Sequence, residues 1–545
     1  MARAQLPALA PAPKVLVLGS SPTLDDQIVD RTPLTQHQTA WLLLSVLIVA
    51  LCGIAYELII AAVSSYLLGN SVAQFSITIG LFMFAMGIGS YLTKFIHDHL
   101  VERFIQIEIA VALVGGLSAA LLFVVFPYYA LYKPVMYGLI LLIGALVGLE
   151  IPLLTRILSR SASFSESLAH VLSLDYIGAL IGSISFPLLL LPSLGLFRSS
   201  FAIGLLNISV AAIALTMFGS SHPSVRGYWK YAFGVIGILL TGLFASGPIT
   251  KFAEGQLFAD EMIYSEQTPY QRIVLTSHPR NGEVRLYLDG HLQFAAMDEY
   301  RYHESLVHPV MSLGKPPKKV LVLGGGDGLA IREVLKFPTI ETIELVDIDP
   351  SVTELGKRLD VIRKLNADSL NDTRVQIIHA DAFNYVQQAF ARLKEGGQWY
   401  DRIIIDLPDP HSEVLNKLYC VEFYRLIRRI LAENGGLVTQ SSSPIITRDA
   451  FWCIGATIEA AEFRVVPYRT HLNSFGEWGF QIAVKTSNPI DLHGISLANV
   501  PRKYLSNEIF QCSQVFALDA VKVPTPINSL FEPKLYMLYE SGLAR

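Results

Sequence analysis

The sequence predicts an α-helical bundle that crosses a membrane several times, followed by an α/β domain built on a doubly wound sheet. The first observation behind this fold class is the distribution of charge, because residues 41–250 hold 15 of the 88 charged side chains and residues 251–545 hold 67. The second is a series of long apolar runs in the charge-poor part. The third is an alternation of strand and helix patterns in the charge-rich part. A membrane half and a soluble half are therefore expected.

The overall composition excludes some classes of protein function. The formal net charge is −4 and 52% of the residues are hydrophobic, which argues against a basic nucleic-acid-binding protein and against a disordered chain. The four cysteines lie far apart without C-x-x-C spacing, so the sequence predicts neither a metal site nor a disulfide framework. We expect a small-molecule partner and no nucleic acid.

The chain begins with a segment, 1–40, that we interpret as a flexible tail, since its longest apolar run, Val15–Leu18, is too short for a membrane span or a signal-peptide core. Seven apolar stretches follow, each roughly 18–25 residues long and able to cross a hydrocarbon core of about 30 Å as a helix. They lie near residues 41–63, 74–96, 105–127, 134–155, 171–192, 199–218 and 229–247. Closely spaced small residues at Gly87–Ser90 and Gly178–Ser183 suit tight helix contacts in lipid, so one bundle is expected.

The lysines and arginines of the loops predict the orientation of this bundle. Nine of them flank the amino-terminal side of the spans, and two, Lys133 and Arg198, flank the opposite side. This bias favours a cytoplasmic amino terminus. With seven spans the α/β half would then lie outside the cytoplasm, unless a re-entrant segment near Phe186–Pro192 changes the number of crossings.

Beyond the bundle the sequence predicts a small β region. The runs Arg272–Thr276 and Val284–Leu288 are separated by a turn that contains Pro and Gly, which indicates a hairpin, and a helix is expected over Glu299–Ser312. The predicted domains are a tail at 1–40, a seven-helix membrane domain at 41–250, a β region at 251–300, a sheet domain at 301–490 and a carboxyl-terminal extension at 491–545.

In the sheet domain, strand and helix patterns alternate, which is typical of a parallel sheet covered by helices. The expected strands are Lys319–Leu323, Thr342–Asp347, Val375–Ala380, Arg402–Ile405, Leu437–Gln440, Phe463–Pro467 and Phe480–Lys485. The expected helices are Leu329–Lys336, Ser351–Leu365, Phe383–Leu393, Val421–Ala432 and Asp449–Ala461.

A glycine-rich turn follows the first strand of this sheet and precedes a helix. Its residues Gly324, Gly325 and Gly326 would let a nucleotide-like ligand approach the backbone at the carboxyl edge of the sheet. The turn also carries a carboxylate, Asp327, which would repel a phosphate and attract a cation. The alternative is a structural turn with a solvated aspartate.

Two further aspartates end the next two strands. Asp347 lies where an acidic side chain accepts the ribose hydroxyls of a bound nucleoside, and Asp381 lies where an acid can accept from an adenine amino group. Together with Asp327 they favour a positively charged sulfonium nucleoside over NAD. The alternative for either of them is a helix N-cap.

The fourth strand ends in a rigid acidic lip. Asp406 and Asp409 lie three residues apart, and Pro408 and Pro410 prevent a regular helix there. Such a lip can bind a flexible polyamine cation and accept its proton. A capping turn is the structural alternative.

These segments together resemble the polyamine aminopropyltransferases, the spermidine synthase family. The resemblance covers residues 265–485, and the whole chain is similar to the bacterial branch with an amino-terminal seven-helix membrane domain. The matching segments are Tyr270-Gln271, Leu288–Gly290, Asp298–Glu304, Gly324–Gly328, Arg332–Lys336, Val346–Asp349, Asp406–Pro410, Phe423-Tyr424 and Gln440-Ser441.

The resemblance implies a Rossmann-like sheet of the methyltransferase type and an enzyme that transfers an aminopropyl group from decarboxylated S-adenosylmethionine to putrescine or a similar diamine. The products would be spermidine and methylthioadenosine, and no permanently bound cofactor is expected. It also implies a protein of the inner membrane, in contact with the lipid bilayer. The synthase domain would face the cytoplasm, where the nucleoside is made, and a homodimer is compatible with this arrangement.

The resemblance also assigns roles to individual residues. It assigns the catalytic base to Asp406. The donor nucleoside would be held by Gln271, Gly324, Gly325, Gly326, Asp327, Asp347, Asp381 and Ala382. The aminopropyl and amine end would be lined by Tyr302, His303, Asp327, Asp406, Asp409 and Gln440. The chain departs from the family in having Asp347 where the ribose acid is usually Glu, and Asn473 where the soluble enzymes have a pocket Tyr.

Two other functions are compatible with parts of the sequence. An S-adenosylmethionine-dependent methyltransferase shares the sheet and the ribose acid, but Asp327 and Asp406 would repel the carboxylate of its cofactor. A polyamine-binding membrane transporter or sensor without turnover is suggested by Glu57, Glu150 and Asp175 in the apolar half, because a carboxylate in lipid is costly and often functional. Glu150 and Asp175 are expected at the same membrane level.

Overall fold

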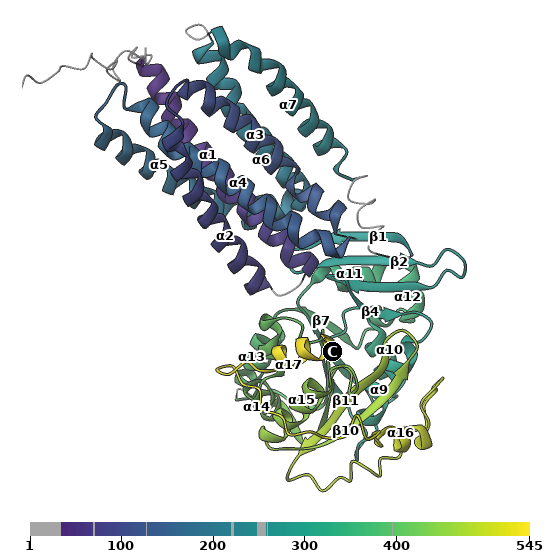
Figure 1. Ribbon diagram of the computed structural model, residues 1–545. Helices are drawn as coiled ribbons and strands as arrows, with labels where there is room; N and C mark the ends of the chain where they lie inside the picture. The colour runs from purple at the N-terminus through teal and green to yellow at the C-terminus, as the bar shows by residue number, and fades with distance from the viewer. Residues whose placement is uncertain are drawn as a thin grey trace, which may run out of the picture.

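Figure 1 shows a long helical bundle set end to end on an α/β domain. The computed structural model describes residues 34–68, 71–126, 128–219, 223–247, 258, 260–394 and 396–544. Most of the predicted tail, 1–40, lies outside the described residues. Its last residues, Gln36–Ala40, belong to the first helix, so this part of the expectation is wrong.

The amino-terminal half contains seven α-helices within its described residues, close to the seven predicted spans. They are α1 (Gln36–Leu68), α2 (Ser71–Leu92), α3 (Leu100–Val125), α4 (Tyr129–Leu158), α5 (Phe164–Ser185), α6 (Leu191–Phe218) and α7 (Trp229–Phe244), with short turns η1 (Thr93–Phe95), η2 (Phe186–Leu190) and η3 (Pro223–Tyr228). In the part of the chain that the structure describes, six stretches are long and apolar enough to cross a membrane, and one of these, Phe164–Phe218, contains both α5 and α6.

The junction between α5 and α6 is not re-entrant. A Cβ on Gly178 would lie 2.3 Å from the carbonyl oxygen of Leu47, and one turn later Gly182 meets Leu51, so α5 runs parallel to α1. The chain continues through η2 and reverses at Gly195, whose φ is 71°. The ring of Phe197 then lies 4.6 Å from that of Phe123, near the end of α3. The amino-terminal end of α1 and the α/β domain are therefore at opposite ends of the bundle (Figure 1).

Glycines bring helices of the bundle into close contact, as the small-residue spacing predicts. A Cβ on Gly89 would lie 2.0 Å from the carbonyl oxygen of Ala145, and one on Gly148 would lie 2.2 Å from that of Met86. Because any side chain at these positions would collide with backbone, α2 and α4 pack backbone against backbone.

Three carboxylates are buried inside the bundle: Glu57 on α1, Glu108 on α3 and Glu150 on α4. Glu108 accepts a hydrogen bond from Asn207 Nδ2 at 2.8 Å. Glu150 interacts with Glu108 and lies within electrostatic reach of Asp175, but neither of its oxygens has a hydrogen-bond donor among the described residues. The expected proximity of Glu150 and Asp175 is thus present, and Glu108 is an additional neighbour that the sequence did not reveal.

The α/β domain contains two sheets. The small antiparallel sheet has the order β1 (Glu261–Gln267), β2 (Arg272–Ser277), β3 (Val284–Leu288) and β4 (His291–Ala295), with the predicted hairpin formed by β2 and β3. The large sheet has the order β10-β11-β9-β8-β5-β6-β7, in which β5 to β9 are parallel and β10 and β11 antiparallel. Its strands are β5 (Lys319–Gly324), β6 (Thr342–Asp347), β7 (Val375–His379), β8 (Tyr400–Asp406), β9 (Leu431–Gln440), β10 (Phe463–Leu472) and β11 (Gly476–Lys485).

Helices cover both faces of the large sheet, each over its own apolar core. They are α9 (Glu299–Met311), α10 (Leu329–Leu335), α11 (Pro350–Arg358), α12 (Asp360–Leu365), α13 (Ala382–Lys394), α14 (Val421–Ile430), α15 (Arg448–Ala460), α16 (Asn507–Ser513) and α17 (Leu535–Leu543), with η4 (Ser369–Asn371) and η5 (Glu413–Tyr419).

Several predicted boundaries differ from the structure. The helix predicted over Val421–Ala432 ends at Ile430, and Leu431 and Ala432 belong to β9. The expected helix Ser351–Leu365 is two helices, because Leu359 has extended backbone angles. The strand predicted to begin at Leu437 begins at Leu431. The last two strands are longer than predicted because they pair from Phe463–Lys485 to Leu472–Gly476, where Gly476 adopts a φ of 76° that allows the reversal.

The register of the parallel strands aligns the functional motifs at one edge. Gly324 is paired with Asp406 and Asp347 with His379, so the glycine turn and the strand-end aspartates lie side by side at the carboxyl ends of the strands. Ligands bind at this edge in open α/β sheets.

The carboxyl-terminal extension packs against the domain. Glu304, on α9, is fully buried and accepts hydrogen bonds from the backbone N–H groups of Lys503, Tyr504 and Leu505 at 2.6 to 2.9 Å. The chain then forms α16 and continues to α17, which packs on α15. The extension is therefore an integral part of the fold.

Candidate active site

A cavity of about 930 Å³ opens at the carboxyl edge of the large sheet, between this sheet and the small β region. All the site residues predicted from the sequence line it: Gln271, Tyr302, His303, Gly324, Gly325, Gly326, Asp327, Asp347, Asp381, Ala382, Asp406, Asp409 and Gln440. The volume suits a nucleoside together with a short chain.

The wall of this cavity is strongly acidic. Six aspartates are among its described lining residues, against one lysine, Lys417, and no arginine. Lys417 forms an ion pair with Asp381 at 2.6 Å. Apart from Asp381, the carboxylates that a cationic ligand would meet form no ion pair with a lysine or arginine among the described residues.

Asp406 ends β8 beside the glycine turn. The hydroxyl of Tyr302 donates to its Oδ1 at 2.7 Å, and a Cβ on Gly324 would lie 2.1 Å from its carbonyl oxygen. Burial raises the pKa of Asp406, while the nearby His303 and the Tyr302 hydrogen bond oppose the rise. The result is a positioned carboxylate that can take up a proton from a bound amine.

Asp409 is the second aspartate of the acidic lip and also lines the cavity. Its Oδ2 accepts hydrogen bonds from Tyr539 at 3.0 Å and from Ser442 at 3.2 Å. Its Oδ1 is buried and has no hydrogen-bond donor among the described residues. Burial raises the pKa of Asp409 to about 6, against the lowering effect of Tyr539, Gln440 and Ser442.

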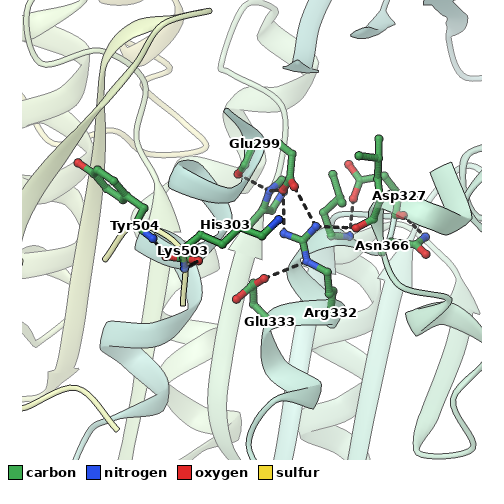
Figure 2. Close-up of polar contacts among 12 residues, drawn as sticks. Glu299, His303, Asp327, Arg332, Glu333, Asn366, Lys503 and Tyr504 are labelled. Carbon is green, nitrogen blue, oxygen red and sulfur yellow. Dashed lines mark hydrogen bonds and ion pairs between the residues drawn. The ribbon is translucent and has the colours of Figure 1, made fainter. Parts of the chain in front are cut away.

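A network of ion pairs supports the wall that carries Asp327 and His303. Figure 2 shows Arg332 between Glu299 and Glu333, with bonds of 2.8 and 2.9 Å to Glu299 and of 2.9 Å to Glu333. His303 Nδ1 lies 2.9 Å from Glu299 Oε2. Burial alone would lower the pKa of His303, but the hydrogen bond and charge of Glu299 raise it. His303 is thus a fully buried, oriented residue of the cavity wall.

Asp327 is held by the turn that carries it. Its Oδ1 accepts from the N–H of Leu329 at 2.9 Å, and its carbonyl oxygen accepts from Asn366 at 2.8 Å (Figure 2). Burial raises its pKa to about 6, with His303 lowering and Asp406 raising it further. The charge of Asp327 is costly without a cationic ligand.

Asp347 braces the glycine turn as well as lining the cavity. Its Oδ2 accepts from the N–H of Gly326 at 3.0 Å, and a Cβ on Gly326 would lie 2.5 Å from the same oxygen. Burial raises its pKa to about 6. Gln271 donates at 3.0 Å to Oδ2 of Asp349, which lies two residues after Asp347 and caps α11.

Asp381 lines the cavity and also caps a helix, the role that the sequence left open as an alternative to ligand binding. Its Oδ1 accepts from the N–H of Asn384 in the first turn of α13, and its Oδ2 holds Lys417. Ala382 begins α13 at the cavity. Gln440, at the end of β9, donates to the carbonyl oxygen of Leu407 and to the hydroxyl of Tyr419, both at 2.7 Å, and so fixes the acidic lip.

Comparison with known proteins supports the same assignment. Residues 299–493 match the family described as the spermine/spermidine synthase domain. The polyamine aminopropyltransferase of Leptospira interrogans is 42% identical over 509 residues, which cover 92% of this chain and 98% of the relative. Polyamine aminopropyltransferase 1 of Ralstonia nicotianae is 41% identical over 527 residues, covering 95% and 98%.

The chain belongs to the polyamine aminopropyltransferase family.

The similarity to these aminopropyltransferases extends through the helical bundle, since it covers more than nine-tenths of both chains. A crystal structure of spermidine synthase in complex with the transition state analogue AdoDATO is 29% identical and covers 47% of this chain and 85% of its own, with a TM-score of 0.43. The resemblance found in the sequence is confirmed, and the chain is a transferase of polyamine biosynthesis.

Sequence reasoning missed several lining residues of this aminopropyltransferase. His291 and His411 stack at 4.3 Å at the mouth of the cavity, and burial lowers the pKa of His411 to about 4. Tyr539 reaches the cavity from α17, beyond the matched region. The apolar spacing of Leu535, Tyr536 and Tyr539 predicts a buried helical face there, but not that it adjoins a site.

Proposed function

We propose that the enzyme transfers the aminopropyl group of decarboxylated S-adenosylmethionine to putrescine and releases spermidine and methylthioadenosine. The observation that carries this proposal is the set of three half-buried carboxylates, Asp327, Asp406 and Asp409, which line one cavity whose described lining residues include a single lysine and no arginine. A sulfonium with an aminopropyl chain and a diamine are both cationic, and decarboxylation removes the group that these aspartates would repel.

The donor nucleoside is assigned to the part of the cavity near the glycine turn. The glycines leave room for its close approach, Asp347 is placed for the ribose, and Asp381 and Ala382 for the base. Asp327 and His303 would face the aminopropyl chain. Each carboxylate oxygen of Asp347 already accepts one hydrogen bond, from the N–H of Gly326 or of Asp349. The remaining lone pair on each oxygen is available to a ribose hydroxyl.

The acceptor amine is assigned to the acidic lip. Its neutral nitrogen attacks the aminopropyl carbon next to sulfur, the carbon–sulfur bond breaks, and the electron pair goes to sulfur, which leaves as a neutral thioether. The proton released by the nitrogen goes to Asp406, which Tyr302 orients. Asp409 and Gln440 hold the distal part of the acceptor.

Product analysis with purified enzyme tests the proposal. We expect spermidine and methylthioadenosine from decarboxylated S-adenosylmethionine and putrescine, and a lower rate with longer or shorter diamines. Methylated amines from intact S-adenosylmethionine would instead establish a methyltransferase. Amine binding without any product from either donor would establish a sensor or transporter.

We also propose that the protein lies in the inner membrane with its synthase domain in the cytoplasm, where the nucleoside donor is made. The seven helices place this domain at the end of the bundle away from the amino terminus of α1. Lys94 in η1, Arg103 in the first turn of α3 and Arg156 in the last turn of α4 lie at the opposite end, where α1 begins. The proposal therefore requires that the side of the bundle richer in lysine and arginine face away from the cytoplasm, against the usual distribution. A reporter fused after Phe258 tests it: activity of a cytoplasmic reporter is expected, and an exported signal contradicts both this orientation and donor supply.

A further inference from the structure

The unequal use of the two oxygens of Asp409 is the starting point of this inference. Tyr539 and Ser442 both donate to Oδ2, while Oδ1 has no donor among the described residues although it is buried at the cavity wall. Tyr539 has 6% of its surface exposed and lines the same cavity. Its hydroxyl therefore fixes which oxygen of Asp409 remains for a ligand.

The helix that carries Tyr539 is held in one register. Leu535 is fully buried in the core shared with α14 and α15. A Cβ on Gly542 would lie 2.7 Å from the carbonyl oxygen of Ile446 and 2.8 Å from the Cα of Thr447, so α17 touches the backbone just before α15. A helix packed this closely cannot slide or rotate without opening these contacts.

Asn528 joins α17 to the rim of the cavity. Its Oδ1 accepts from the N–H groups of Lys534 and Leu535 at 3.1 and 3.2 Å, which satisfies free donors at the start of α17. Its Nδ2 donates to the carbonyl oxygen of Tyr419 at 3.0 Å. Tyr419 ends η5, and this segment contributes Val414, Leu415 and Leu418 to the cavity lining.

The hydroxyl of Tyr539 is a dependable donor. Burial, together with the charge of Asp409, raises its pKa, so the hydroxyl keeps its proton over the range in which Asp409 titrates. A donated hydrogen bond stabilises the ionised form of Asp409. Losing it would therefore raise the pKa of Asp409 from about 6.

Resting on the function proposed above, we propose that Tyr539 is a positioning residue of the amine-acceptor end of the cavity, where it holds Oδ2 of Asp409 and leaves Oδ1 for the acceptor amine. The carboxyl-terminal segment is then part of the active site. The matched synthase domain ends at residue 493, so the acceptor end is completed by chain outside it.

Tyr539→Phe removes only the hydroxyl and tests this role in the full-length enzyme. We expect the KM for the acceptor amine to rise about tenfold, the value of one hydrogen bond to a charged group, while the KM for the donor stays unchanged. The acidic limb of kcat/KM for the acceptor should move to higher pH. In an Asp409→Asn background the same change should have no further effect.

Tyr536→Phe is the matched control, because Tyr536 lies on the same helix, is equally buried at 6% exposed, and does not line the cavity. It should leave both KM values and the pH profile unchanged. Equal effects of both variants would mean that α17 acts through stability alone and would overturn the inference. So would wild-type acceptor kinetics in Tyr539→Phe while Asp409→Asn is impaired. If Asp409→Asn itself keeps a wild-type acceptor KM, the acceptor assignment of the proposed function fails instead.

Discussion

Buried carboxylates occur in both halves of the molecule, and they are treated differently. In the α/β domain Glu299 and Glu333 are 4% and 1% exposed and are neutralised by Arg332 and its neighbours. In the bundle Glu108 and Glu150 are equally buried, yet no ion pair joins them to a lysine or arginine within the described part of the chain.

A third group lies between these extremes. Asp327, Asp406 and Asp409 are half-buried and face a cavity, and no ion pair joins them to a lysine or arginine among the described residues. Burial of an acid is thus compatible with three arrangements: a resident cation, a space for a cationic ligand, or a carboxyl pair that must hold a proton.

Asp406→Asn should remove the proton acceptor from the three aspartates that face the cavity. We expect nearly intact binding of the donor nucleoside and a fall in turnover by a factor on the order of 10² or more, because the amide cannot accept the proton of the amine. Steady-state kinetics and donor binding by calorimetry measure the two effects. Turnover near the wild-type value would reject Asp406 as the base.

Glu333→Gln should disrupt the buried ion pairs around Arg332. Glu333 accepts from Arg332, Lys336 and His308, and these interactions lower its pKa to about 2 despite burial. Its contribution to stability is present above the usual carboxylate pKa and is lost as the pH falls toward about 2. We expect a loss of about 3 kcal/mol at pH 7, measured by denaturant unfolding.

The control for Glu333 is an ion pair of the same kind at the surface. Glu341 pairs with Lys318, and both are about two-thirds exposed. Glu341→Gln should leave the unfolding transition unchanged, because solvent screens such pairs. Equal losses in both variants would remove the distinction between buried and exposed pairs.

Asp327→Asn should stabilise the protein, in contrast to Glu333→Gln. The pKa of Asp327 is raised to about 6, so its favourable contribution is present below the usual carboxylate pKa and is lost as the pH rises through about 6. We expect a gain of about 1 to 3 kcal/mol at pH 8 that shrinks at pH 4, with reduced turnover.

Asp372→Asn is the control for Asp327→Asn, because the pKa of Asp372 is shifted in the opposite direction. Arg374 lowers the pKa of Asp372 to about 2, so this variant should gain nothing at pH 8. A gain at Asp327 that persists unchanged at pH 4 would show that it does not come from the charge.

Glu150→Gln should have the smallest effect. Because no lysine or arginine among the described residues pairs with Glu150, we expect it to hold a proton, and an amide then replaces it with little change in charge or shape. Thermal unfolding in detergent and aminopropyl transfer should both stay close to wild type. A large loss of stability would instead mean that the carboxylate is ionised and paired in the native bundle.

Much of the fold was predictable because each half has its own periodic signal. The apolar runs predicted all seven helices of the bundle, and the alternation of strands and helices predicted the parallel sheet from Lys319 onward. The break at Leu359 was not predictable, since nothing local marks it: the apolar spacing continues through it. Strand ends near Leu431 and Leu472 depend on pairing partners that a local pattern does not contain.

The site residues that end a strand could be predicted from the sequence. Gly324, Asp347 and Asp406 each end a strand, and parallel register brings strand ends together. Tyr539 could not be predicted, because its position depends on the long-range contacts of Asn528 and Gly542. Likewise Glu108 has no sequence relation to Glu150, and only the crossing of α3 and α4 makes them neighbours.

The anchoring of the carboxyl-terminal segment at Glu304 and Asn528 has a consequence for its evolution. Between these two points the chain is buried at Phe510 and Ala520 and exposed around Val515 and Leu518, at 67% and 91%. Because both ends are tied by side-chain hydrogen bonds, insertions or deletions near Leu518 change the length of a surface loop without moving α17. Among homologous chains, length variation should therefore concentrate between these anchors, while the spacing from Asn528 to Tyr539 stays constant.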